Sequence, residues 1–466
     1  MKKTIISFGL ALTLGVTSCD KRLDIEPRQS VDAATALSSA QDIESALVGA
    51  YGVLPAQLGG GLADAELYGT NLNLLAELLA SDNYVAWRGT FAGYREVTNR
   101  QMLATNSEAQ RTWIVAYQVI NVANSVLGAL DKVSDAEQKA AFEGEARFLR
   151  GIMYFELVRL FGLPWGATAA NDQPGVPLIT RATLSQEQAA ETQPRATVAQ
   201  VYTQVIDDLT KASTLLPEDN DVRADKFSAL GFLSRVYLQQ SDYAKALAAA
   251  NEVIASGNFQ LNSSVTGPFT NRNSDESIFE IQENTQNNPG TSNDGLTTFY
   301  ASIPSGGSAV GRGDVQVLNG FVESYNPNDL RRKNLFYIGF KGAGTRYYSG
   351  KWTDFGGNIP IIRLAEILLT RAECNLRLNS AVGATPAADL NAVRARAGVP
   401  AIAAPTVADV LKERQLELAF EGVRIHDIKR TKGKTGELNW NDPKLVLPIP
   451  QREIDANSQL TQNAGY

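Results

Sequence analysis

The chain has 466 residues, of which 44% are hydrophobic and 20% charged, so intrinsic disorder is excluded as its main state. Its formal net charge is −7 and it has no basic tract, which makes nucleic acid a poor partner because that affinity rests on Lys and Arg. Two cysteines cannot form a disulfide framework, and a single histidine cannot build a His-rich zinc site. No metal site and no cofactor is therefore predicted.

Residues 1–18 have the features of an export signal. After a basic start, the apolar run Ile5–Val16 spans 12 residues, which is too short to cross a bilayer. The sequence Val16-Thr17-Ser18-Cys19 resembles a bacterial lipobox, which predicts cleavage before Cys19 and a lipid anchor on its thiol. The alternative is an ordinary signal peptide with a chance cysteine. Residues 19–466 are then predicted to form a single unit.

Apolar residues at helical spacing predict most of the secondary structure. One long helix carries a stripe from Phe142 to Leu160 at spacings of three and four residues. Ser134 and Glu137 form a predicted capping box before it, and Gly162 ends it. Two further helices begin with capping boxes: Thr197 with Gln200, for a helix to about Leu216, and Thr406 with Asp409, for a helix to about Phe420.

Residues 226–256 carry a pattern of small, large and aromatic residues over two helices joined at Ser241-Asp242-Tyr243. Alanines on both helices allow close approach, which matches one tetratricopeptide unit. Residues 361–397 form a weaker second unit. The predicted fold is therefore mostly α, with a tetratricopeptide-like scaffold of about four helix pairs. These pairs lie within 109–161, 198–256 and 361–425.

Two long stretches, 56–106 and 258–358, have a different composition. They are rich in Gly, Asn, Ser, Thr and aromatic residues, with short strand-like runs such as 277–281. Loops of this length inside a compact protein are usually functional or disordered, and the aromatic content argues against disorder. We therefore expect a large, irregular, loop-rich half that binds a ligand.

Five segments, spread in order over nearly the whole chain, carry a family resemblance. They are Cys19 to Pro27, Glu145 to Trp165, Ile361 to Gly398, Glu413 to Arg424, and Leu447 to Ile454. In this order they resemble the SusD/RagB family of outer-membrane nutrient-binding lipoproteins. The resemblance implies a mostly α-helical protein in which four tetratricopeptide-like helix pairs support a more irregular ligand-binding half.

The resemblance also implies a function, partners and a location. Family members are lipid-anchored at the cell surface, cap a TonB-dependent β-barrel transporter of the outer membrane, and hand it oligosaccharides or other nutrients without catalysis. The ligand stays open between a glycan, a glycoprotein fragment and a peptide, because the two irregular stretches match no ligand-specific pattern. Two other functions also stay open: a surface glycan hydrolase, and a protein-binding scaffold without a small ligand.

Candidate ligand-binding residues come from the two irregular stretches. The apolar face of a pyranose packs against an aromatic ring, and its hydroxyls need amide, carboxylate or guanidinium partners. Two of the five tryptophans lie in these stretches, whereas Trp113 is expected in the core of a helix. The predicted ligand-binding residues are Asn83, Tyr84, Trp87, Arg88, Tyr300, Tyr348 and Trp352. Alternatively, Tyr84 and Trp87 are the buried edge of a short turn.

The segment Glu413 to Arg424 is predicted to form a structural ion-pair network. Glu413, Glu417 and Glu421 share one helical face and repel each other unless cations approach. Arg363 and Arg371 are candidate partners. The alternative is a catalytic pair, because a glycosidase needs two carboxyls at a defined separation.

Three smaller features are interpreted as structural or left open. His426 is expected to be a packed residue at a helix end, and Cys374 an inert thiol in an apolar helix. Residues 219–225 resemble a calcium loop only loosely, because Ala224 stands where the sharp turn needs glycine.

Overall fold

The computed structural model describes residues 36–55, 67–285, 288–289, 294–304, 310–341 and 344–466. Cys19 and the lipobox therefore lie outside the described residues. The longer helices are α2 (Ala40–Val53), α3 (Asn71–Leu79), α4 (Ala92–Asn99), α5 (Ser107–Gly128), α6 (Ala136–Phe161), α8 (Val198–Leu215), α9 (Lys226–Gln239), α10 (Tyr243–Ala255), α15 (Leu364–Leu378), α16 (Pro386–Arg396), α17 (Val407–Glu417) and α18 (Arg424–Arg430).

The remaining elements are short. The shorter helices are α7 (Gln186–Ala189), α11 (Gly267–Thr270), α12 (Leu296–Tyr300), α13 (Asn319–Glu323), α14 (Leu330–Asn334), α19 (Gln451–Ala456), η2 (Leu130–Lys132) and η4 (Pro443–Leu445). The strands are β1 (Val85–Trp87), β2 (Ser277–Ile281), β3 (Ile303–Pro304), β4 (Val315–Val317), β5 (Phe336–Lys341), β6 (Gly344–Ser349), β7 (Ile359–Arg363), β8 (Lys434–Thr435) and β9 (Leu438–Asn439).

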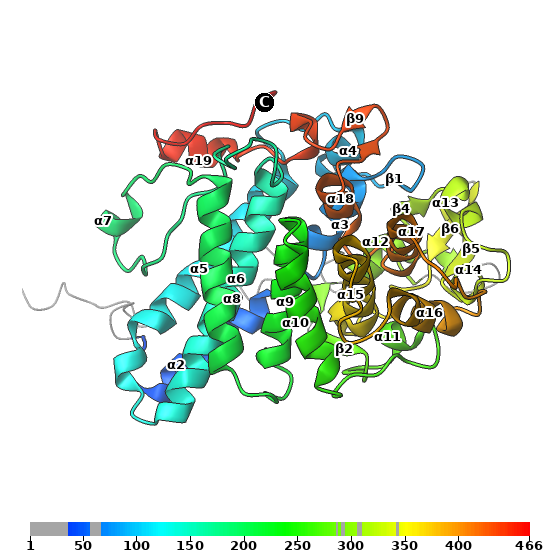
Figure 1. Cartoon of the computed structure of the whole chain (residues 1–466). Helices are drawn as coiled ribbons and strands as arrows, with labels where there is room; N and C mark the ends of the chain where they lie inside the picture. Colours follow the sequence, from blue (N-terminus) through cyan, green and yellow to red (C-terminus); the bar gives the residue numbers. More distant parts are fainter. Residues whose placement is uncertain (1–35, 56–66, 286–287, 290–293, 305–309, 342–343) are drawn as a thin grey trace, which may run out of the picture.

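The long helices pack side by side in a row that confirms the helical scaffold (Figure 1). Helix α6 contacts both α5 and α8, α9 contacts α8 and α10, and α10 packs against α15. The stripe predicted from Phe142 to Leu160 is buried on α6. The pair predicted within 226–256 forms α9 and α10. Its assignment as a tetratricopeptide unit, and the organisation of 19–466 as one unit, stay predictions.

Most of the predicted helix ends are found. Both capping boxes form, at Thr197 with Gln200 and at Thr406 with Asp409, and Gly162 caps the C-terminus of α6. The predicted box at Ser134 is wrong by one residue, because the carboxylate of Asp135 accepts the backbone N–H of Gln138. Helix α17 ends at Glu417 rather than near Phe420, whose φ of 67° lies outside helical geometry.

The two stretches predicted to be irregular contain more order than expected. Besides short helices, they contribute an antiparallel sheet of five strands in the order β1-β4-β6-β5-β3. Strand β1 pairs with β4, with Val85 opposite Val317 and Trp87 opposite Val315. In Figure 1 the strands β4, β5 and β6 lie on the right, with the row of long helices at the left and centre. This pairing brings together residues far apart in the chain.

One large hydrophobic cluster joins helices and strands, with members from Ile43 to Leu460. Phe148 of α6, Phe232 of α9 and Phe279 of β2 meet inside it, with ring centroids 5.1 to 6.2 Å apart. Edge-to-face packing of such rings adds to the energy of burying them. Across the described ranges, no helix combines the length and the apolar character that spanning a bilayer requires.

Candidate functional site

The aromatic residues predicted to stack on a ligand are buried. Trp87 is 6% exposed and Trp352 is 4% exposed. The other predicted rings are more deeply buried still: Tyr84, Tyr300 and Tyr348. The expectation that these rings stand out from the loops is wrong, because neighbouring strands and helices cover them. A ring in such a position offers no open face to a sugar.

Trp87 and Trp352 anchor the backbone of neighbouring segments instead. The Trp87 ring packs on Tyr94 and Phe299 with centroids 4.6 and 5.1 Å away. Its Nε1 donates a hydrogen bond of 3.2 Å to the carbonyl of Phe91. In the same way, Trp352 Nε1 donates to the carbonyl of Phe420 at 3.1 Å. Both indole N–H groups are therefore satisfied inside the protein, as buried tryptophans require.

Asn83 and Arg88 lie at the surface, unlike the predicted aromatic residues. Asn83 adopts a left-handed φ of 45° in the turn between α3 and β1, which asparagine tolerates better than most residues. The backbone N–H of Arg88 donates to the carbonyl of Asp314 at 2.6 Å. Its Nε donates to Oε1 of Gln316 at 2.9 Å. Their role as ligand contacts stays a prediction.

The loop after β1, strand β4 and the residues just before β4 together form a partly exposed surface, which we call the 88–91 rim. It consists of Arg88, Thr90, Phe91, Arg312 and Gln316. Phe91 is half-buried, and the Arg312 guanidinium lies 4.7 Å from its ring centroid. Arg312 is held by an ion pair of 3.0 Å to the buried carboxylate of Asp314. The rim therefore contains one aromatic ring with a guanidinium over it, and a second guanidinium that is hydrogen-bonded to an amide.

Gly89 allows the loop of the rim to turn closely over Trp87. A Cβ atom at Gly89 would lie 2.4 Å from the Trp87 ring and 2.8 Å from the Asp314 carboxyl carbon. Side chains are not found at such distances, so a larger residue here would displace the indole or the loop. Trp87 thus supports the 88–91 rim from beneath.

The sequence predicted Arg88 of this rim but did not single out Phe91, Arg312 or Gln316. Phe91 lies four residues after Trp87, and its aromatic character was the one local signal for it. Arg312 and Gln316 carried no such signal, because only the pairing of β4 with β1 brings them there. Which ring of an aromatic segment is exposed depends on packing from distant segments.

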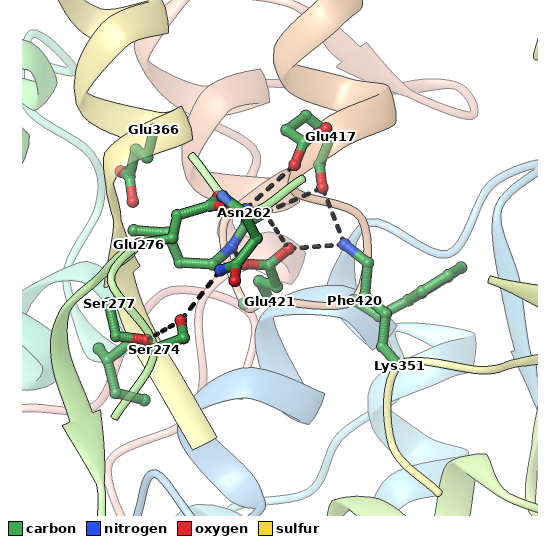
Figure 2. A network of polar contacts seen from close by, with 12 residues as sticks. Asn262, Ser274, Glu276, Ser277, Lys351, Glu366, Glu417, Phe420 and Glu421 are labelled. Carbon is green, nitrogen blue, oxygen red and sulfur yellow. Dashed lines mark hydrogen bonds and ion pairs between the residues drawn. The ribbon is translucent and has the colours of Figure 1, made fainter. Parts of the chain in front are cut away.

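The predicted ion-pair network forms around Arg363 at the end of β7. Its guanidinium contacts Glu276, Glu417 and Glu421 at 2.6, 3.0 and 2.8 Å. Figure 2 shows Lys351 pointing toward the same carboxylates, with 2.6 Å to Glu421 and 2.8 Å to the carbonyl of Glu417. Burial raises the pKa of the Glu417 carboxyl, but the guanidinium groups around it outweigh burial and hold that pKa well below its usual value.

The other members of the network extend it to the neighbouring helices. Glu413 lies 2.7 Å from both Arg331 and Arg394. Arg371 does not take part as predicted, because it pairs with Asp389 at 2.7 Å. The carboxylates of this segment are buried and paired with cations rather than open to a cleft. The interpretation of the segment as a structural network is confirmed by these contacts.

Two other predicted core residues are found in the core. Cys374 of α15 is buried, and burial raises the pKa of its thiol to about 12. His426 of α18 is buried, and burial lowers the pKa of its imidazole well below the usual value. Within the described residues, no group of three or more acidic, His or Cys side chains has a geometry that could hold a metal ion.

Comparison with known proteins places this architecture in a family. Residues 23–238 match the family model SusD-like_3, described as "Starch-binding associating with outer membrane". Residues 324–445 match the model SusD_RagB, described as "SusD family". The chain is 24% identical to a SusD-like protein P38 of Formosa agariphila over 100% of this chain and 99% of that protein.

Solved structures agree with the family models. A SusD superfamily protein from Bacteroides thetaiotaomicron superposes with a TM-score of 0.78 at 26% identity, covering 91% of this chain and 99% of that one. Surface glycan-binding protein A from Bacteroides uniformis superposes with a TM-score of 0.77 at 25% identity, covering 91% and 100%. The chain belongs to the SusD/RagB family.

Proposed function

We propose that this protein binds a glycan at the cell surface through the 88–91 rim and delivers it unchanged to a TonB-dependent outer-membrane transporter. Family membership supports the proposal, as do a family model described as starch-binding and a structural relative named as glycan-binding. The rim supplies the chemistry that a sugar needs. Aromatic contact alone is modest in energy, so affinity would depend on the polar groups around the ring.

The single observation that carries the proposal is the arrangement around Phe91. Its half-buried ring packs on Tyr94 and Phe299, and the Arg312 guanidinium lies over it. Arg88 and Gln316 lie on the same rim and are already hydrogen-bonded to each other. Such mutual contacts restrict the side chains before a ligand arrives, which lowers the entropy cost of binding.

We further propose that the protein is anchored in the outer membrane through a lipid on Cys19. The lipobox-like residues 16–19 support this, as does the family description that names association with the outer membrane. Stable attachment requires more than one acyl chain, because a single chain anchors only marginally. Mass spectrometry of the mature N-terminus would detect the acylated cysteine, and an unmodified cysteine would contradict the anchor.

The proposal includes no catalysis. This part of the proposal is supported by the acidic residues that were considered as catalytic. They form ion pairs with buried arginines: Glu413 with Arg331, and Glu417 and Glu421 with Arg363. Glycoside hydrolysis needs one carboxyl that can give up a proton and a second at a defined distance. A carboxyl whose pKa is held low by guanidinium groups is a poor proton donor.

The test is glycan binding by rim variants, with matched controls elsewhere on the surface. A glycan array first identifies a binding glycan, and calorimetry then measures Kd for wild type, Phe91→Ala and Arg88→Ala. We expect about tenfold weaker binding for Phe91→Ala and a smaller loss for Arg88→Ala. The controls Phe340→Ala and Arg181→Ala remove an exposed aromatic ring and an exposed guanidinium outside the rim.

Each alternative gives a different result. If both rim variants bind the glycan with wild-type affinity, the protein binds glycan but the rim is not the binding site. Failure of the wild-type protein to retain any glycan on the array would favour a scaffold that binds only protein. Release of shorter sugars from the bound glycan would show a hydrolase.

A further inference from the structure

A small cavity between α6 and α18 is lined by basic side chains. It has a volume of about 10 Å³, which is room for one water-sized guest. Arg159 comes from α6, and His426 and Lys429 come from α18. All three side chains are more than nine-tenths buried. Trp165, which follows the end of α6, and Tyr202 of α8 also line the cavity.

Several polar atoms around this cavity have no hydrogen-bond partner among the described residues. They are Nε and Nη1 of Arg159 and Nε2 of His426. Arg159 uses only Nη2 for its ion pair with Glu156. Buried donors without acceptors cost about 1–3 kcal/mol each, so native proteins rarely leave several of them together. Both residues line the cavity. The guanidinium nitrogens are donors, and Nε2 of a neutral imidazole is a donor in the tautomer that carries its proton there, so a guest that accepts hydrogen bonds would satisfy them.

The charge around the cavity favours an anion over a neutral guest. The arginines nearby already have carboxylate partners: Arg159 with Glu156, Arg430 with Glu373 and Asp427, and Arg235 with Glu366. Lys429 differs, because its ammonium donates to the carbonyl of Arg159 at 3.1 Å and pairs with no carboxylate of the described residues. Water would bring two protons that need acceptors, whereas an anion accepts from every donor on the wall.

We propose that this cavity is a binding site for a single small anion of the halide type, held by Arg159, His426 and Lys429. The anion would accept from the orphaned guanidinium and imidazole nitrogens and neutralise the buried ammonium. It would stabilise the contact of α18 with α6. Burial lowers the pKa of the Lys429 ammonium to about 7, which is consistent with a cation that lacks a counter-charge. The site is independent of the 88–91 rim.

Thermal unfolding of the whole protein in different sodium salts tests the proposal. Above the Kd of the halide, each tenfold increase in chloride or bromide concentration should raise the Tm by about 1–2 °C. Sodium gluconate at equal ionic strength should not, because its anion is too large for the cavity. The variant Lys429→Met should lose the halide-specific rise, and Lys211→Met, the same change at an exposed lysine of α8, should keep it.

Crystals grown in sodium bromide give a readout that needs no variant. An anomalous peak within hydrogen-bonding distance of Arg159 Nε and His426 Nε2 is expected. Equal Tm slopes in chloride and gluconate, together with no anomalous peak, would overturn the proposal and leave a water in the cavity. A halide effect that persists in Lys429→Met without a peak at this cavity would place the anion elsewhere and overturn it as well.

Discussion

The row of long helices and the five-stranded sheet show two ways in which this chain builds structure. Helices α5, α6, α8, α9 and α10 follow each other in sequence, with only η2 and the short α7 between them, and pack largely on their neighbours in this series. The sheet instead pairs β1 with β4, so that residues 85–87 meet residues 315–317. Local patterns therefore specify the helices, whereas distant pairing specifies the sheet.

The difference also shows in the interactions that hold each region. The helices bury apolar stripes and end in side-chain caps. The region where the segments near the sheet meet the C-terminal helices relies on buried charges, with Arg363 contacting three carboxylates. Buried ion pairs give little net stability when complete but cost much when one partner is removed. Substitutions in the buried network should therefore cost more than substitutions of exposed charges on the helices.

The largest effect is expected for Arg363→Leu. Removing the guanidinium leaves Glu276, Glu417 and Glu421 buried with too little positive charge, so the free energy of unfolding should fall by about 3–5 kcal/mol. Urea titration measures this change. Lys211→Ala breaks an exposed ion pair on α8 and should cost at most about 0.5 kcal/mol. Similar losses of unfolding free energy in the two variants would mean that the ion-pair network around Arg363 does not hold this region together.

A smaller effect, dependent on pH, is expected at Glu77 of α3. Its buried carboxylate accepts from the backbone N–H groups of Gly422 and Val423 at 2.7 and 3.1 Å. Burial raises the pKa of this carboxyl to about 7 despite those bonds. The folded state therefore binds more protons than the unfolded state between pH 4.5 and 7, and stability falls as pH rises through that range.

The variant Glu77→Gln keeps the acceptor oxygen and removes the titration. As the pH rises from 4.5 to 7.5, the free energy of unfolding of the variant should increase by about 2–3 kcal/mol relative to that of wild type. Urea unfolding at each pH measures this difference. Glu437→Gln changes an exposed carboxyl and should follow the wild-type curve. Parallel curves for Glu77→Gln and wild type would show that Glu77 is ionised throughout this range.

A loss of about 1 kcal/mol is expected when the cap of α8 is removed. Thr197→Ala deletes the hydroxyl that accepts the backbone N–H of Gln200. Thr203→Ala on the same helix removes an exposed hydroxyl that caps nothing and serves as the control. The free energy of unfolding should fall only in the first variant. Equal effects would show that the cap does not determine where α8 begins.

The smallest effect is expected on the outer face of the sheet. Ile338 of β5 is 49% exposed and lies opposite Tyr347 of β6. Ile338→Thr keeps a β-branched side chain on the strand, so the free energy of unfolding should change by no more than about 0.5 kcal/mol. A loss above about 2 kcal/mol would mean that another part of the molecule covers this face.

The sequence by itself determined the helices, several of their caps and the ion-pair network. These features depend on residues three or four positions apart, such as Thr197 with Gln200 or Glu413 with Glu417, and such spacings are visible in the chain. The five motif segments also indicated the family. The alternative interpretation of Tyr84 and Trp87 as a buried edge agrees with their position in the structure.

Only the tertiary structure decided which aromatic residues are buried and which polar residues share a surface. Trp87 and Trp352 have the composition of a sugar-binding loop around them, yet both rings are buried, with Tyr94 and Phe299 packed on Trp87 and Phe269 on Trp352. Arg312 meets Phe91, and Gln316 meets Arg88, because β4 pairs with β1 across about half of the chain. Burial is set by whatever packs against a residue, and several of these packing partners, such as Phe299 for Trp87 and Phe269 for Trp352, lie far away in sequence.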